Sequence, residues 1–155
     1  MASKPGVDIE NPIIHYSYGY AAQLCILNEE GKIDKIVAAH DAGKIINPTL
    51  FEGQIEGAIH MGLGYALREN LPMKNSRLLS DRMKDLGLLR ILETPKITVI
   101  GVEEKDPVGP YGAKGVGEIG LVPTAAAVAN AFNHFDHKRR YQLPLAWPCE
   151  KFPVK

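Results

Sequence analysis

The sequence predicts an α+β domain in which helices pack on a layered, mixed sheet. Two observations support this class. Short runs rich in β-branched and aromatic residues are typical of strands, and a longer stretch has apolar residues at the three- and four-residue spacing of a helix. These segments follow one another as strand, strand, helix, strand and helix. A chain of 155 residues is long enough to form one hydrophobic core.

Two strands open the predicted fold. Residues 15–27 are rich in aromatic and apolar side chains, which favours a strand. A polar turn with Gly31 follows, where glycine tolerates a positive φ. Residues 33–43 then predict a second strand. The short turn between the two strands makes them an antiparallel hairpin.

An amphipathic helix comes next, and its start is well marked. Asn47 can act as the N-cap, and Pro48 lies at the first helical position, where no N–H partner is lost. Four glycines interrupt the helix, and each costs about 1 kcal/mol relative to alanine. They are Gly53, Gly57, Gly62 and Gly64. Close packing is the favoured reason for tolerating them, and close approach of a ligand is the alternative.

The rest of the chain is less regular. Residues 71–95 mix charges with leucines and predict an irregular connection with at most a short helix. Residues 96–104 predict a clear strand, and residues 123–132 predict a second helix. The proline-containing tail that follows is expected to run over the surface.

Composition narrows the function classes. Lys plus Arg and Asp plus Glu both number 18, so no charge excess points to nucleic acid or a membrane surface. Two cysteines, Cys25 and Cys149, cannot form a disulfide framework or a usual metal site, and they fit a cytoplasmic protein. No apolar stretch approaches the roughly 20 residues of a membrane span. Residues 1–12 predict a leader or linker, and residues 13–155 the domain.

A glycine-rich stretch, GPYGAKGVGEIGLVPT, occupies residues 109–124. It contains GVGEIG, a literal match to the GxGxxG pattern of dinucleotide-binding loops. In those proteins the pattern lies directly between a strand and a helix. Here Pro107 and Pro110 separate the match from the preceding strand. A P-loop requires Ser or Thr after Gly-Lys, whereas this stretch continues with Gly115 after Lys114. Both nucleotide-binding interpretations are therefore rejected.

Glu118, at the centre of this stretch, has a functional and a structural interpretation. In the functional one the glycines surround a ligand: their successive N–H groups can form an anion nest, or their backbone can pass close to a bulky ligand. A carboxylate partly desolvated beside such a ligand would have a raised pKa and could act as a general base. The alternative is that Glu118 caps the following helix or pairs with Lys114.

Other polar residues have mainly structural interpretations. His40 and Asp41 end the second predicted strand and are expected to stabilise the turn before Asn47. His60 lies among apolar helix residues and is expected to be a satisfied buried histidine. Lys114 could pair with a carboxylate or neutralise a ligand, and both remain open.

Two long stretches resemble one family. They are HDAGKIINPTLFEGQIEGAIHMGLGYALRE, at residues 40–69, and GPYGAKGVGEIGLVPTAAAVANAF, at residues 109–132. Both are similar to the C-terminal part of the molybdenum-binding subunit of molybdenum hydroxylases, the xanthine dehydrogenase and aldehyde oxidase family. The resemblance implies that the fold is part of the domain that binds the molybdenum cofactor.

The resemblance also implies roles for individual residues. Glu118, in GAKGVGE, corresponds to the general base that takes a proton while a heterocycle or aldehyde carbon is hydroxylated with water-derived oxygen. Gly115, Val116 and Gly117 would place backbone against the cofactor. Gln54, in EGQIEG, matches a glutamine associated with molybdopterin. None of these residues is expected to bind the metal directly.

Cofactors and partners follow from the same resemblance. Molybdopterin is the expected cofactor, with 2Fe-2S clusters and FAD on partner chains or domains. The expected partners are the remaining part of the molybdenum subunit, iron–sulfur and flavin subunits, and a small-molecule substrate; a homo-oligomer is left open. Complete molybdenum subunits are several times longer, so this chain would bring the base but only part of the cofactor site. The alternative is a non-catalytic assembly fragment that binds no cofactor alone.

Overall fold

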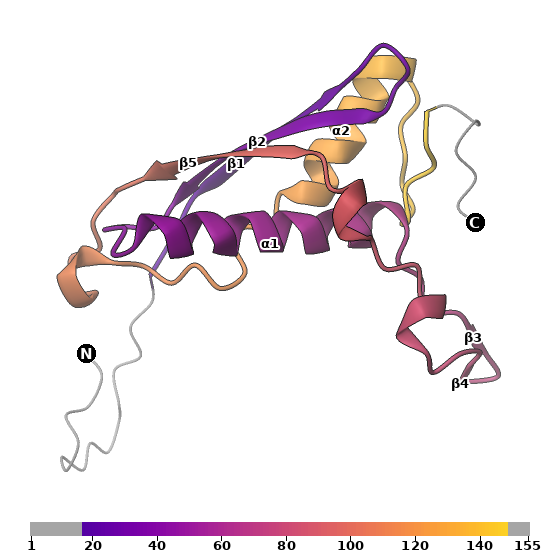
Figure 1. The fold of residues 1–155 in the computed structure, drawn as a ribbon, viewed down its shortest axis with the longest axis horizontal. Helices are drawn as coiled ribbons and strands as arrows, with labels where there is room; N and C mark the ends of the chain where they lie inside the picture. The colour runs from indigo at the N-terminus through magenta and orange to yellow at the C-terminus, as the bar shows by residue number, and fades with distance from the viewer. Residues whose placement is uncertain (1–16, 149–155) are drawn as a thin grey trace.

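The computed structural model describes residues 17–148, and the predicted leader, His15 and Cys149 lie outside them. A three-stranded mixed sheet with two helices forms the body of the fold (Figure 1). In the sheet order β1-β2-β5, β1 and β2 are antiparallel and β2 and β5 are parallel. The elements are β1 (Ala21–Leu27), β2 (Ile33–Asp41), α1 (Pro48–Leu67), β5 (Lys96–Val102) and α2 (Thr124–Asp136). The predicted class and element order are confirmed.

Both helices pack on one face of the sheet, where the core lies. Alternate strand residues such as Cys25, Ile36 and Ala38 are buried on that face because side chains of a strand alternate in direction. Burial raises the pKa of the Cys25 thiol to about 12, so this cysteine is a core residue rather than a nucleophile. From the helices, Ile55, Ile59, Leu63, Val128 and Phe132 complete the core.

The start of α1 is the predicted one. The side chain of Asn47 accepts a hydrogen bond from the N–H of Leu50 at 3.0 Å, and Pro48 is the first helical residue. Three of the four glycines of this helix divide into two groups. A Cβ at Gly62 would lie 2.7 Å from Cβ of Thr124 in α2, so close packing explains this glycine. At Gly53 and Gly57 an added Cβ would meet nothing within 4 Å, so the packing interpretation is wrong for them within the described chain.

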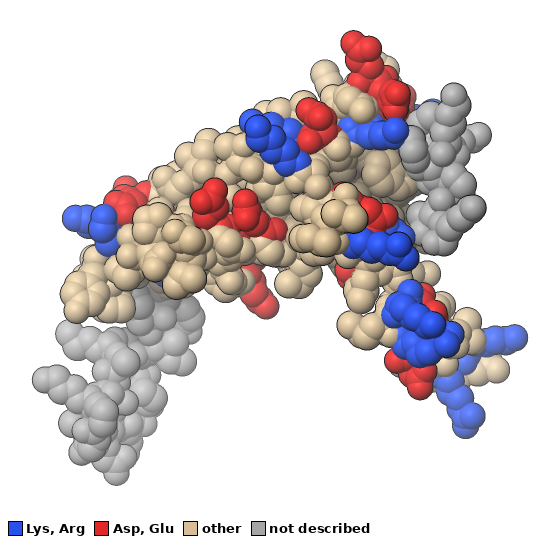
Figure 2. Space-filling view, in the orientation of Figure 1, with Lys and Arg blue, Asp and Glu red and all other residues tan. Residues whose placement is uncertain are grey.

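Residues 71–95 form the irregular connection that the sequence predicts. They contain a small hairpin and two single 3-10 turns, and no α-helix. This segment projects away from the body (Figure 1), and Lys and Arg side chains are dense over it (Figure 2). The elements are β3 (Met73–Lys74), β4 (Arg77–Leu78), η1 (Met83–Asp85) and η2 (Ile91–Glu93).

The C-terminal part differs from expectation. Helix α2 continues to Asp136, beyond the predicted end. The segment after it does not simply follow the surface: Leu145 is buried, and the ring of Trp147 lies 5.4 Å from that of Phe132. Apolar residues of the tail therefore close one side of the core. None of the helices within residues 17–148 is long and apolar enough to cross a membrane.

Candidate functional site

Four chain segments meet at one end of the sheet. The carboxyl ends of β2 and β5 point the same way because the strands are parallel, and the start of α1 lies beside them (Figure 1). The connection from β5 to α2, which contains the glycine-rich stretch, passes this end and then runs along α1. Loops at the carboxyl ends of parallel strands are a common place for ligand sites in α/β folds.

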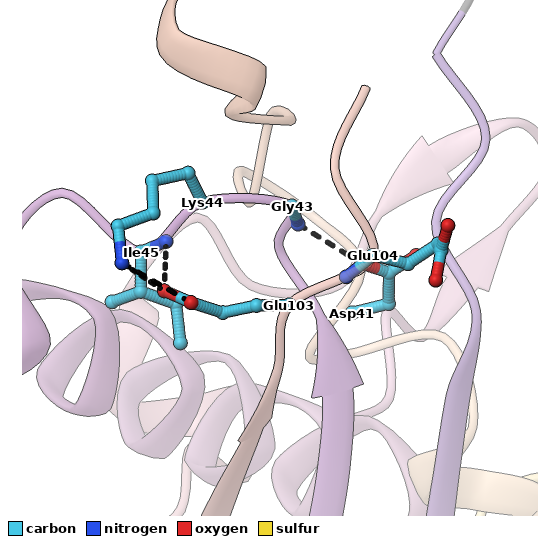
Figure 3. A network of polar contacts seen from close by, with 6 residues as sticks. All are labelled: Asp41, Gly43, Lys44, Ile45, Glu103 and Glu104. Atoms are coloured by element: carbon cyan, nitrogen blue, oxygen red, sulfur yellow. Dashed lines mark hydrogen bonds and ion pairs between the residues drawn. The ribbon is translucent and has the colours of Figure 1, made fainter. Parts of the chain in front are cut away.

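Asp41 anchors the first part of the glycine-rich stretch. Its carboxylate forms an ion pair with Lys114 at 2.6 Å, and both side chains are buried. The same carboxylate accepts from the N–H of Gly43 at 2.9 Å and from that of Glu104 at 3.3 Å (Figure 3). Burial alone would raise the pKa of Asp41, but the bonds from Lys114 and the two N–H groups lower it below its usual value. Asp41 therefore stays ionised and joins β2 to two later loops.

Backbone contacts align the same segments. The N–H of Lys114 donates to the carbonyl of Ala42 at 2.9 Å, and the N–H of Lys44 donates to the carbonyl of Gly112 at 2.9 Å. On the neighbouring loop, the Glu103 carboxylate accepts from Nζ of Lys44 at 3.1 Å and from the N–H of Ile45 at 2.8 Å (Figure 3). The entry to the glycine-rich stretch is thus fixed to the turn between β2 and α1.

A second network, which the sequence did not predict, anchors the other end of the glycine-rich stretch. Nε2 of Gln23 donates to the carbonyl of Gly120 at 2.7 Å and lies 3.2 Å from Nε2 of His40, while Oγ1 of Thr124 donates to Oε1 of Gln23 at 2.9 Å. A glutamine within the apolar run AAQLCIL was the signal that could have revealed it. Residues 115–119, between the two anchors, form an open segment.

The fully buried His40 is one part of this network. Because Nε2 faces the amide donor of Gln23, the ring proton is assigned to Nδ1, which has no partner among the described residues. Burial lowers the pKa of His40 below its usual value, so the ring is neutral near pH 7. The expected role at the turn before Asn47 agrees with the contacts of Asp41, which bonds to Gly43, whereas His40 contacts Gln23 and not that turn.

Four of the predicted site residues lie in the open segment between the anchors, and the fifth, Gln54, reaches it from α1. Nε2 of Gln54, in α1, donates to the carbonyl of Gly117 at 3.0 Å and so joins the helix to the stretch. Its Oε1 accepts no hydrogen bond from a described residue and is available as an acceptor. Gly115, Val116 and Gly117 therefore lie beside Gln54 in space, although their sequence positions are far apart.

Gly115 and Gly117 fit a cofactor that presses on the backbone. Neither has a positive φ, and a Cβ built on either meets nothing within 4 Å, so this chain's own structure does not require glycine there. The N–H groups of residues 115–118 donate to no other described residue. Four free N–H donors beside an amide side chain suit a polar or anionic group, and glycine lets that group approach closely.

Glu118 is exposed in the described chain, and its carboxylate makes no hydrogen bond or ion pair with another described residue; only its backbone carbonyl is bonded, to the N–H of Leu121 at 3.1 Å. The structural alternatives for it are not observed. Lys114 pairs with Asp41 instead, and the N-cap position of α2 is Pro123 with no side-chain hydrogen bond. Residues 17–148 leave Glu118 exposed, so they do not themselves desolvate its carboxylate as expected.

The remaining histidine candidate is bonded to a residue outside the glycine-rich stretch. Nδ1 of His60 lies 2.7 Å from Oγ1 of Thr94, so this half-buried histidine is satisfied, as predicted. Within residues 17–148, no three His, Cys, Asp or Glu side chains are grouped so as to hold a metal ion.

Comparisons with known proteins point to one family. Residues 7–95, more than half of the chain, match the family described as molybdopterin cofactor-binding domain. This range includes Gln54 and ends before the glycine-rich stretch.

Several named relatives agree with this match. The putative xanthine dehydrogenase molybdenum-binding subunit XdhA of Escherichia coli K12 is 36% identical over 101 residues, which are 64% of this chain and 13% of that protein. The carbon monoxide dehydrogenase large chain of Hydrogenophaga pseudoflava is 33% identical over 77% of this chain and 16% of its own length. The aldehyde oxidoreductase subunit PaoC of E. coli K12 is 36% identical over 80% of this chain and 18% of that protein. The chain thus spans under a fifth of these relatives.

Solved structures show the same fold. A Cu,Mo-CO dehydrogenase matches 74% of this chain and 15% of its own, with a TM-score of 0.66 and 29% identity. The aldehyde oxidoreductase of Desulfovibrio desulfuricans matches 71% of this chain and 12% of its own, with a TM-score of 0.62 and 34% identity.

Proposed function

The chain belongs to the molybdopterin cofactor-binding domain family, and on that premise we propose that it forms part of a molybdenum-dependent hydroxylase. In this proposal residues 115–118 and Gln54 contact molybdopterin, and Glu118 is the general base. When bound, the cofactor supplies the redox chemistry that adds water-derived oxygen to a heterocycle or aldehyde carbon. The family match and the names of the relatives support the cofactor class.

The open glycine backbone is the observation that carries this proposal. Two glycines with unstrained backbone and free space at Cβ lie in a run of four residues whose N–H groups have no described partner, and a group bound from outside this chain best explains both features. Hydrogen bonds from N–H groups and from Gln54 would orient such a group. The anchors at Asp41 and Gln23 would fix the stretch so that binding costs little ordering of the backbone.

Glu118 has the properties that a base at this position requires. It follows the open glycines directly, and no described residue engages its carboxylate. A cofactor and the rest of the subunit covering this exposed side chain would desolvate it, which favours the uncharged acid and so increases its basicity. Electron transfer would then require iron–sulfur and flavin centres on partner chains. We also propose that the assembly is cytoplasmic, which the low cysteine content supports.

Replacement of the base tests the proposal. In the assembly purified with its partner chains, Glu118→Gln is expected to lower turnover of an aldehyde or heterocyclic substrate by about 100-fold or more while molybdenum and pterin contents stay unchanged. Glu29→Gln, an exposed glutamate in the β1–β2 turn, is the matched control and should keep full activity. Full turnover in Glu118→Gln would overturn the assignment of the base. An assembly without molybdenum or pterin would favour the non-catalytic alternative.

A further inference from the structure

Strand β1 has an open edge. The N–H of Asp41 donates to the carbonyl of Tyr20, so in the antiparallel register the even-numbered β1 residues bond to β2. Ala21, Gln23 and Cys25 therefore direct their N–H and C=O groups away from the sheet, where they bond to no described residue. The strand sequence AAQLCIL contains no charge and no proline, the usual devices that keep an edge unpaired.

The sheet face opposite the helices is apolar and exposed. By strand alternation and register, Leu24 and Ile26 of β1 share this face with Val37 of β2 and with Ile100 and Val102 of β5. Leu24 is 60% exposed, Ile26 38%, Ile100 47% and Val102 43%. No described element covers them. Apolar side chains gathered on one sheet face are typical of an interface.

Charge on the same face indicates what the covering surface carries. Lys35 and Lys96 are paired directly across β2 and β5, and neither forms an ion pair with a described residue. Like charges directly opposite each other in a sheet are destabilising, so a carboxylate from outside would stabilise this end of the face.

A cleft of about 500 Å³ continues the open edge on the helix side of the sheet. Gln23 and Cys25 line it from β1, and Asn130, Asn133, His134 and His137 line it from α2 and its C-cap. A strand added to β1 would direct alternate side chains into this cleft and the others onto the apolar face. The cleft favours polar side chains, because amide and imidazole groups line it.

From these four features we propose that β1 pairs with a strand of the polypeptide that carries the rest of the molybdenum-binding subunit, which also covers the apolar face. That strand alternates aliphatic residues with polar ones, and a carboxylate beside it meets Lys35 and Lys96. The occupant follows from the relatives, in which the matching segment is 13 to 18% of one longer chain. This inference rests on the proposed function, since it identifies the partner of that site.

The test uses the tagged chain expressed in its native cells and purified with whatever binds it. Mass spectrometry is expected to identify a longer polypeptide of the molybdenum-binding subunit family. Amide hydrogen exchange at Ala21, Gln23 and Cys25 should be slow in the assembly and fast in the isolated chain. Leu24 and Ile26, whose amides bond to β2, should be protected in both samples and serve as internal controls.

Two variants separate pairing at the edge from burial of the face. Leu24→Lys should lower the amount of bound polypeptide by about tenfold or more, because its ammonium group would be buried against aliphatic side chains. Ala21→Pro removes an outward N–H without touching the β2 pairing and should also weaken binding. Leu92→Lys, at a residue 96% exposed on η2, is the control and should bind normally. Circular dichroism confirms that each variant is folded.

Different outcomes overturn different claims. Full binding by folded Leu24→Lys and Ala21→Pro, or unchanged exchange of the three amides, contradicts the surface. A dimer of this chain through β1, with no longer polypeptide bound, contradicts the occupant. If β1 is protected as expected but the assembly contains no pterin, the surface stands and the proposed function fails.

Discussion

Asp41 joins three chain segments through one carboxylate. It is bonded to Lys114 at the start of the open segment, to the turn at Gly43 and to the loop at Glu104. Lys114 also donates to the carbonyl of Tyr18 at 2.9 Å, so the pair fixes the chain just before β1 as well. The position of the glycine-rich stretch therefore depends on Asp41, a residue far from Glu118 in sequence.

Breaking this pair should destabilise the chain. In Asp41→Asn the ammonium group of Lys114 would stay buried without a counter-charge, which costs about 3 kcal/mol. Denaturant unfolding measures the change as a lower midpoint. Glu30→Gln, which breaks the exposed pair with Lys32, is the control and should leave the midpoint nearly unchanged. Equal midpoints for Asp41→Asn and the unsubstituted chain would contradict the anchoring role.

His40 makes stability depend on pH. Its pKa is lowered in the folded chain, so as pH falls through about 6.5 the unfolded chain binds the proton first. Stability is therefore expected to be full above that pH and to decrease on acidification. Urea midpoints at pH 7.5 and 5.5 should differ, and His40→Gln should reduce the difference whereas His134→Gln at an exposed position should not. A pH dependence that survives in His40→Gln would assign it to another group.

At the scale of elements, local signals were enough to predict the order of the three long strands and the two helices, although β1 begins at Ala21 rather than at residue 15 and the β3–β4 hairpin was not predicted. Asn47 and Pro48 mark the start of α1 because capping depends on neighbouring residues alone. The end of α2 and the burial of Leu145 were not predictable in this way, because both depend on contacts of the tail with the core. The resemblance selected Gln54 and Glu118, whereas the Gln23 network required the pairing of β1 with β2.

The glycines of α1 give a prediction at this scale. Gly57→Ala should raise the stability of the isolated chain by about 1 kcal/mol, because alanine favours a helix and its Cβ meets open space. Gly62→Ala should lower stability by about 1 to 3 kcal/mol, because its Cβ would overlap Thr124. Thermal unfolding compares them. Stabilisation by both substitutions would show that helix propensity, rather than packing, controls these positions, and destabilisation by Gly57→Ala would contradict the open space at its Cβ.

At the scale of the whole molecule, residues 17–148 leave two of their own surfaces without a covering layer: the sheet face beside β1 and the open segment with Glu118. Both follow naturally if this chain completes its fold and its site against further polypeptide and a cofactor. The helix-side core is closed by contrast, with α1, α2 and the tail packed on the sheet.

The most direct test of this account is the molybdenum and pterin content of the assembly purified with its partner chains. We expect molybdenum and pterin in equal amounts in the unsubstituted protein. Both should be lost in Gly117→Val, where the added side chain would occupy the space assigned to the cofactor while the fold stays intact. Absence of both from the unsubstituted assembly, or undiminished content in Gly117→Val, would contradict it.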